Sequence, residues 1–176
     1  MSDRPSRQDA FYEQTVADYG PALDRLARSY ELDAEKRNDL LQEIHFALWR
    51  SFEQFAEQCS IRTWIYRVAH NVAASHVDRS LRHRSRGLVS LEEAEAIETG
   101  GDPNETFDRQ RALDHLYKLI HRLRPLEREV ILLYLEGLDA AAIGDVTGLS
   151  AANVATRVHR IKKLLALQFR TGETNG

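Results

Sequence analysis

The chain has one cysteine, four prolines and no long apolar run among its 176 residues, and each shortage excludes a class of protein. The lone Cys59 provides neither a disulfide framework nor a cysteine-based zinc site. No apolar stretch approaches the ~20 residues of a membrane span, and the polar N-terminus lacks the apolar segment of a secretion signal. We therefore expect a cytoplasmic protein that does not insert into membranes. Cys59 is expected to be a passive residue, with a redox role as the alternative.

The sequence also lacks the alternation of apolar and polar residues that is typical of strands. It has no glycine-rich phosphate loop, no nucleophile motif and no carboxylate pair with a pocket, so we expect no cofactor and no enzymatic activity. His70, His76 and His83 lie about 9 Å or more apart along a helix, too far for one metal ion, and their arginine neighbours indicate a DNA-facing surface. Helical spacing predicts an all-α protein with helices at about 8–30 (broken or bent at Gly20–Pro21), 33–55, 61–82, 109–123, 126–136, 140–147 and 151–169.

The net charge of −3 hides blocks of opposite sign. Residues 31–57 and 87–108 are acidic, whereas 62–86 and 150–170 are basic. Two basic surfaces indicate two nucleic-acid contacts, and the acidic parts indicate a different partner. Glycine, proline and acidic residues predict a flexible acidic linker at 85–107. The architecture expected is two small helical domains, at 8–84 and 108–170, joined by this linker.

The stretch from Asp139 to Leu165 reads as a helix-turn-helix. Asp139 is a good N-cap for a short helix, Gly148 supplies the left-handed residue that ends it, and Ser150 caps a longer helix. Along that helix Val154, Val158, Ile161 and Leu165 form one buried stripe. An ordinary helical hairpin with a solvated basic face is the alternative. If the stretch is instead a DNA-binding unit, its small side chains approach the groove of duplex DNA and its basic side chains reach the phosphates. The predicted contacts are Ser150, Ala152, Asn153, Thr156, Arg157, His159, Arg160 and Lys163.

The helix at 61–71 interleaves aromatic and basic residues. Aromatic side chains hold unstacked bases and arginines follow the backbone, so this pattern suits single-stranded or melting DNA. Trp64 has a second interpretation, because an aromatic residue in a small domain is more often part of the core. The residues that carry the pattern are Arg62, Trp64, Tyr66 and Arg67.

Two motifs in this order resemble a known family. The segments Asp39-Leu40-Leu41-Gln42-Glu43-Ile44 and Thr63-Trp64-Ile65-Tyr66-Arg67-Val68-Ala69-His70-Asn71 resemble region 2 of bacterial sigma factors of the extracytoplasmic-function (ECF) branch. The segment Leu123-Arg124-Pro125-Leu126-Glu127-Arg128-Glu129-Val130, followed by Leu135-Glu136-Gly137-Leu138 and the helix-turn-helix, resembles region 4. Region 3 is absent, as in that branch.

The resemblance implies a promoter-specificity subunit that binds core RNA polymerase, recognises the −35 and −10 elements, helps to melt the −10 region and initiates transcription. By position, Asp39, Gln42, Glu43 and Arg50 fall on the surface that docks on the polymerase clamp helices. A merely solvated helix face is the alternative reading of these residues. Part of the region 4 surface is expected to accept the polymerase flap, and an anti-sigma factor is expected as a further partner.

The resemblance also assigns the −10 and −35 contacts. Asn71 matches the position that helps to recognise a flipped −10 base, and the loop Phe55–Ile61, with Ser60 and Ile61 at its end, matches the one that selects the base. Thr156, His159 and Arg160 are expected nearest the −35 bases.

The chain departs from the family pattern at one place, and two alternative functions stay open. Family members often have Glu-Ile-Ala where this chain has Ala142-Ile143-Gly144, and Gly144 weakens its helix by up to ~1 kcal/mol relative to alanine. A stand-alone helix-turn-helix regulator would bind a duplex operator as a dimer. A sigma-like interaction module would sequester a regulator and never initiate transcription.

Overall fold

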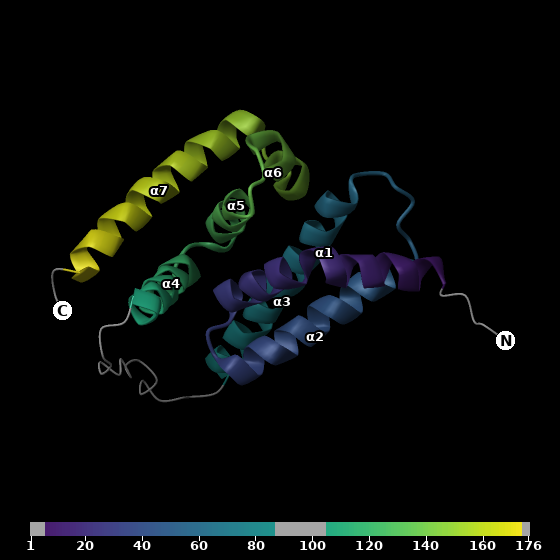
Figure 1. Cartoon of the computed structure of the whole chain (residues 1–176), viewed down its shortest axis with the longest axis horizontal. Helices are drawn as coiled ribbons and strands as arrows, with labels where there is room; N and C mark the ends of the chain where they lie inside the picture. Colours follow the sequence, from purple (N-terminus) through teal and green to yellow (C-terminus); the bar gives the residue numbers. More distant parts are fainter. Residues whose placement is uncertain (1–5, 87–104, 174–176) are drawn as a thin grey trace.

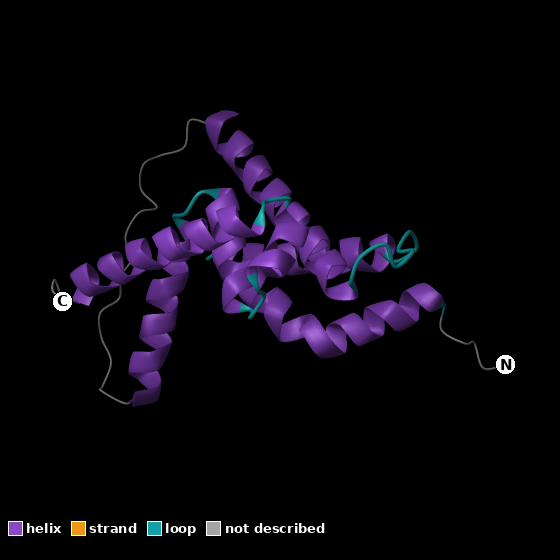
Figure 2. Cartoon of the chain, turned by 90° about the horizontal axis from the view of Figure 1, so that it is seen from above, coloured by secondary structure: helices purple, strands orange, loops and turns teal. Residues whose placement is uncertain are grey.

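The structure is a computed structural model that describes residues 6–86 and 105–173. Within these ranges it contains seven α-helices and no strand (Figure 2), which confirms the predicted all-α fold. The predicted linker lies for the most part outside the described residues. The N-terminal bundle consists of α1 (Arg7–Tyr30), α2 (Ala34–Ser51) and α3 (Ile61–Arg86), and the C-terminal bundle of α4 (Glu105–His121), α5 (Pro125–Leu135), α6 (Ala140–Thr147) and α7 (Ala151–Glu173) (Figure 1).

Local capping chemistry sets most helix starts. Ser6 and Asp9 form a reciprocal capping box at the start of α1, and the Asp33 carboxylate accepts a hydrogen bond from the Lys36 N–H at 3.0 Å at the start of α2. Helix α1 continues through Pro21, where the sequence predicted a break or bend. Helix α2 ends four residues before the predicted position, because the chain turns after Ser51.

Two aromatic residues pack into the core just after the end of α2. Phe52 and Phe55 are buried, and both rings pack against Phe11, with centroids 5.7 and 5.5 Å apart. Burying these two aromatic side chains is worth several kcal/mol.

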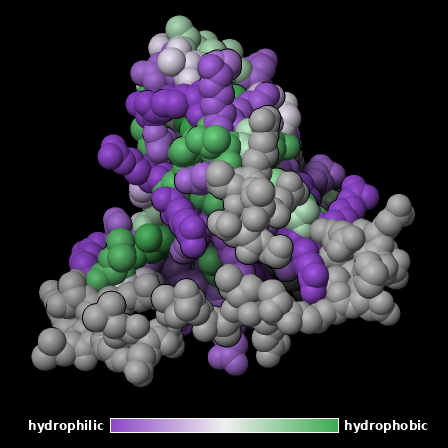
Figure 3. Space-filling model, turned by 90° about the vertical axis from the view of Figure 1, so that its left-hand side faces the viewer, coloured by the Kyte–Doolittle hydropathy of each residue, from purple (hydrophilic) through white to green (hydrophobic). Residues whose placement is uncertain are grey.

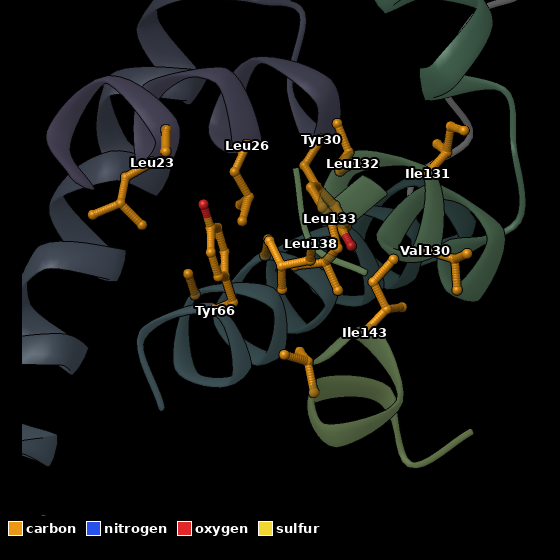
Figure 4. Packing of buried hydrophobic residues seen from close by; sticks show 14 of the residues in the cluster. Leu23, Leu26, Tyr30, Tyr66, Val130, Ile131, Leu132, Leu133, Leu138 and Ile143 are labelled. Carbon is orange, nitrogen blue, oxygen red and sulfur yellow. The ribbon is translucent and has the colours of Figure 1, made fainter. Parts of the chain in front are cut away.

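The two bundles share one continuous apolar core. Leu26 and Tyr66 from the N-terminal bundle meet Leu132, Leu133 and Leu138 from the C-terminal bundle (Figure 4). Helices α1 and α3 therefore lie against α4 and α6 across the bundle boundary, as well as against α2. The buried stripe predicted for the last helix is also present, since Val154, Val158, Ile161 and Leu165 are all buried.

Two glycines inside helices have opposite surroundings. A Cβ on Gly144 would lie 2.6 Å from the backbone oxygen of Leu149, whereas a Cβ on Gly20 would meet no atom within 4 Å. Gly144 therefore lets the turn at Gly148, which has φ +77°, pass close to α6. Helix propensity alone favours alanine over glycine at position 144, whereas this close approach disfavours alanine there.

We predict that Gly144→Ala lowers the free energy of unfolding by about 1 kcal/mol, because a clash costing ~1–3 kcal/mol exceeds the propensity gain of ~1 kcal/mol. Gly20→Ala is the matched control and should raise it by up to ~1 kcal/mol. Urea denaturation of the two variants measures both changes. A Gly144→Ala protein as stable as Gly20→Ala would contradict the steric argument.

Candidate nucleic-acid and polymerase interfaces

The second helix of the helix-turn-helix presents a polar face to solvent. The Asp139 carboxylate caps α6 by accepting from the Ala142 N–H at 2.8 Å, and the Ser150 hydroxyl accepts from the Asn153 N–H at 3.3 Å at the start of α7. Because the apolar stripe of α7 is buried against α5 and α6, its other residues face outward. All eight predicted duplex contacts lie on this helix or at its cap, and all but the partly buried Arg157 are exposed.

Two of these basic side chains are held in place by neighbours. The Arg157 Nε donates to the Asn153 Oδ1 at 2.7 Å, and Arg160 forms an ion pair with Glu127 of α5. Lys163 and His159 lie on the exposed side of the same helix. A helix that combines small residues at its N-terminus with pre-oriented basic residues suits the major groove of duplex DNA.

The loop before α3 has an unusual backbone and two anchors. Glu57 adopts φ +58°, which is rare for a residue other than glycine, and its carboxylate pairs with Arg7 at 2.7 Å. The Ser60 hydroxyl accepts from the Thr63 N–H at 3.1 Å and so caps α3. Ser60 is exposed and Ile61 is half-buried, so the end of this loop is open to a ligand.

Trp64 takes part in the core of the N-terminal bundle. Its indole N–H donates to the Ser51 hydroxyl at 2.9 Å, and its ring lies 5.2 Å from that of Phe55. These contacts agree with the interpretation of Trp64 as a support of the fold. Its DNA contact stays a prediction, since the side chain is only half-buried.

The remaining predicted −10 residues are divided between two faces of α3. Asn71 and Arg67, four positions apart on α3, are both exposed. Arg62 is half-buried and Tyr66 is only 2% exposed, and both lie toward the C-terminal bundle. Arg62 donates to the backbone oxygen of Glu136 at 2.7 Å, and Arg67 donates to that of Asp145. The structure thus does not bring the aromatic and basic residues of 61–71 onto one open surface, because residues 62 and 66 share the helix face that packs against α5.

An open groove runs between the outer faces of α2 and α3. It measures about 540 Å³, and Asn71 and Glu43 both line it. Glu43 also pairs with Arg79, one of the basic residues of α3. Sequence reasoning assigned Glu43 to polymerase docking and Asn71 to the −10 element, and the structure places the two side chains in one groove. The other lining residues are Phe46, Ala47, Val72, Ser75 and Arg79.

The outer face of α2 carries an aromatic pair that sequence reasoning missed. Phe46 is 62% exposed and Trp49 is 38% exposed, with their rings stacked at a centroid distance of 6.4 Å. The Trp49 N–H donates to Asp9 at 3.0 Å, which orients the indole. Two aromatic residues three positions apart on an otherwise polar helix face are the signal that would have found them. Among the predicted docking residues, Asp39, Gln42 and Arg50 are exposed and Glu43 is partly buried.

A second hollow lies in the C-terminal bundle. It has a volume of about 300 Å³, and its lining includes Leu138, Ile143 and Val158. At its edge Lys162 lies 5.1 Å from the centre of the Tyr134 ring and donates to the Tyr134 hydroxyl at 3.2 Å. The lining is mainly apolar, which suits a protein side chain better than a nucleotide.

Exposed leucines also occur on α4 and α7. Leu113, Leu164 and Leu167 are each more than 40% exposed. Figure 3 views the molecule from this side, where apolar surface is interrupted by polar side chains. Isolated leucines of this kind are ordinary on a protein surface and define no site.

The prediction that the histidines of α3 form a DNA-facing surface is wrong for two of them. His70 is 3% exposed, and its Nδ1 lies 3.0 Å from the Tyr30 hydroxyl. His76 is largely buried between Glu31 and Glu43, at 3.8 and 3.9 Å. Both side chains lie on the part of α3 that packs against other helices. The side chain of His83 lies outside the described residues. The described residues hold no group of three or more potential metal ligands and no helix long and apolar enough to cross a membrane.

Comparison with known proteins identifies both bundles. Residues 15–83 match the family model for Sigma-70 region 2, and residues 113–165 match that for Sigma-70, region 4. The chain belongs to the sigma-70 family. The protein is therefore a promoter-specificity sigma subunit of RNA polymerase, with region 2 and region 4 in the predicted order.

Several relatives are similar to this sigma factor over most of their length. RNA polymerase sigma factor NccH of Alcaligenes xylosoxydans xylosoxydans is 27% identical, over 95% of this chain and 92% of the relative. RNA polymerase sigma factor YlaC of Bacillus subtilis is 24% identical, over 92% and 91%. The ECF RNA polymerase sigma-E factor of Escherichia coli K12 is 24% identical, over 72% and 70%.

Two solved structures share the fold of this sigma factor. CnrH, in a complex with the cytosolic domain of CnrY, superposes with a TM-score of 0.65 at 21% identity, over 91% of this chain and 88% of that one. RpoE of Bartonella quintana, in a complex with the anti-sigma factor NepR, gives a TM-score of 0.63 at 20% identity, over 88% and 93%.

The buried His70 and the half-buried Glu129 give the folding stability of this sigma factor opposing dependences on pH. Burial lowers the pKa of His70 from 6.5 to about 3, so its contribution to stability is lost as the pH falls below 6.5, where the unfolded chain takes up the proton. Burial raises the pKa of Glu129 from 4.5 to about 7, so its contribution is full below pH 4.5 and is lost as the pH rises toward 7. Between pH 4.5 and 6.5 the two slopes, each about 1.4 kcal/mol per pH unit, oppose each other.

We predict that single substitutions separate the two slopes. In His70→Gln the free energy of unfolding should rise as the pH falls from 7 to 4.5, because only Glu129 remains. In Glu129→Gln it should fall over the same range. Urea denaturation at a series of pH values measures both slopes, and identical slopes in the two variants would refute the assignment.

Proposed function

We propose that this sigma factor binds core RNA polymerase through α2 and the C-terminal hollow, and reads promoter DNA through α7 and the outer side of α3. The observation that carries the proposal is the pairing, in one chain, of a region 2 match with a region 4 match, each containing a polar helix face open to DNA. The functional domains would span 8–84 and 108–170, with 85–107 as the connection. The chain itself would catalyse no reaction and would act in the cytoplasm, where the polymerase works.

The −35 element would be read as duplex by α7. Thr156, His159 and Arg160 are exposed on the part of the helix that can enter a major groove, and Arg160 would exchange its ion pair with Glu127 for a base or phosphate contact. Arg157 and Lys163 would hold phosphates, together with the N–H groups at the helix start near Ser150.

The −10 element would be read from the groove between α2 and α3. The Asn71 amide offers a donor and an acceptor to the edge of one base, and this side chain is exposed. The loop that ends at Ser60 and Ile61 would select the accepted base. Its conformation is supported by the backbone of Glu57 and the pairing of Glu57 with Arg7.

Docking on the polymerase clamp would centre on the aromatic pair of α2. Phe46 and Trp49 provide the exposed apolar area, and Asp39, Gln42 and Arg50 provide a polar surround. Protein interfaces have this organisation, with aromatic anchors inside a polar rim. The flap would insert an apolar side chain into the hollow lined by Leu138, Ile143 and Val158.

An anti-sigma factor is the further partner we propose. The structure of Bartonella RpoE contains the anti-sigma factor NepR, and this chain shares its fold. The same exposed docking surfaces, α2 and the C-terminal hollow, are available to such an inhibitor.

Run-off transcription with core polymerase and a library of randomised promoters tests the function. Transcripts that require the protein and share two spaced motifs are expected. A duplex site bound by the protein alone, without any dependent transcript, would favour a stand-alone regulator. Polymerase binding without any dependent transcript would favour an interaction module.

We predict that Asn71→Ala lowers transcription from the selected promoters by about tenfold or more, since a base contact of this kind is worth ~1–3 kcal/mol. Affinity for core polymerase should be unchanged. Gln14→Ala, which removes an exposed amide on α1, is the matched control and should transcribe like the wild type. Equal activity of the two variants would remove Asn71 from the −10 site.

We predict that Phe46→Ala weakens binding to core polymerase by roughly tenfold or more, because the ring is an exposed anchor of the docking surface. The fold should be retained, as judged by an unchanged free energy of unfolding. Val16→Ala, which shortens an exposed apolar side chain on α1, serves as the control. Fluorescence-detected titration with core enzyme measures both affinities, and equal values would show that the ring does not contact the clamp.

A further inference from the structure

The start of α1 is connected to the end of α2 at one tryptophan. The Trp49 indole N–H donates to the Asp9 carboxylate at 3.0 Å, and the Gln8 side-chain amide donates to the Trp49 backbone oxygen at 2.8 Å. That oxygen lies in the last turn of α2, where backbone carbonyls lack a full set of intrahelical donors. Figure 1 shows the two helix ends side by side. The first turn of α1 therefore holds both the side chain and the backbone of Trp49.

Asp9 is itself fixed by the capping box of α1. Its Oδ2 accepts from the Ser6 hydroxyl at 2.7 Å and from the Ser6 N–H at 3.1 Å, while its Oδ1 accepts from the Trp49 indole. The hydrogen bond from Trp49, followed by those from Ser6, lowers the pKa of Asp9, so the carboxylate is ionised near neutral pH and accepts at both oxygens. Local helix chemistry thus sets the position of the acceptor that meets the indole.

Trp49 lies on the face of α2 that is proposed to dock on the polymerase clamp. Asp39, Gln42, Phe46 and Trp49 follow one another at spacings of three and four residues, so they share one side of the helix. The Trp49 ring is stacked on that of Phe46, with 29° between the ring planes. Trp49 is 38% exposed, so packing in the core does not by itself restrain this side chain. The hydrogen bond to Asp9 supplies the restraint.

An aromatic side chain that is ordered before binding favours association. Ordering a rotatable side chain at an interface costs binding free energy, and a side chain that is already ordered avoids this cost. We propose that Asp9 is a positioning residue for polymerase docking, which holds the Trp49 indole in the orientation that stacks on Phe46 and meets the clamp. The proposal rests on the proposed function. It extends the docking surface from α2 to the first turn of α1, a segment that carries none of the predicted docking residues.

A purely structural role is the competing explanation, since the same hydrogen bonds join α1 to α2. The two helices already pack through Phe11, whose ring meets those of Phe52 and Phe55. The bond between Asp9 and Trp49 lies at the surface, where exchange with water makes a hydrogen bond worth little for folding. Its main effect is therefore on the orientation of the indole.

The first experiment observes the indole directly. The full-length chain has two tryptophans, so a nitrogen–proton correlation spectrum contains two indole N–H resonances, which Trp49→Phe assigns. Asp9→Ala should move the Trp49 resonance and speed its exchange with solvent, because the N–H loses its acceptor. The Trp64 N–H donates to Ser51, and its resonance is the internal reference that should not move. An unmoved Trp49 resonance would overturn the positioning role.

The second experiment measures the affinity of the full-length chain for core polymerase. Asp9→Ala should weaken binding by about threefold to tenfold, the cost of ordering one free side chain on association. Trp49→Phe keeps an aromatic ring and removes the N–H, so Asp9→Ala should cause no further loss in that background. Ser6→Ala is the matched control, because it removes the other partner of the capping box. It should lower the free energy of unfolding as Asp9→Ala does and leave the affinity unchanged.

The remaining outcomes are distinguishable. An equal loss of affinity in Ser6→Ala would assign the effect to helix capping, and a further loss in the Trp49→Phe background would assign it to a route that bypasses the indole. Either result overturns the proposal, as does a moved Trp49 resonance without any loss of affinity. If Phe46→Ala weakens binding and Asp9→Ala does not, the positioning role alone fails. If neither substitution weakens binding, the proposed docking surface itself is wrong.

Discussion

Helix α3 contacts three different environments on different sides of its axis, and the arrangement of the molecule follows from this constraint. Ile65, Ala69 and Ala73 are buried against α1 and α2. Arg62 and Tyr66 lie against the C-terminal bundle, and Asn71 faces solvent. Because a helix turns by about 100° per residue, these three sets alternate along the sequence and give no single stripe. Apolar and polar residues are therefore mixed along the sequence of α3, although each face of the helix carries residues that suit its own environment.

The boundary between the bundles also contains polar groups that a purely apolar contact would avoid. His70 is buried with one ring nitrogen bonded to Tyr30 and the other, Nε2, without a hydrogen-bond partner. Arg128 is buried with two of its nitrogens in the same state, although its third donates to backbone oxygens of His121 and Leu123. Unpaired buried polar atoms each cost roughly 1–3 kcal/mol. A boundary built in this way is weaker than its apolar area indicates.

Local chemistry explains which parts of the structure were predictable from sequence. The helix-turn-helix was predicted to the residue for α6, because Asp139, Gly148 and Ser150 act within a few positions of themselves. The exposed polar face of α7 followed from the same periodicity. The interactions of Arg62 and Arg67 with Glu136 and Asp145 span more than 70 residues, and no pattern in the sequence announces them. For the same reason His70 looked like part of a basic surface until its partner, Tyr30, 40 residues earlier, was known.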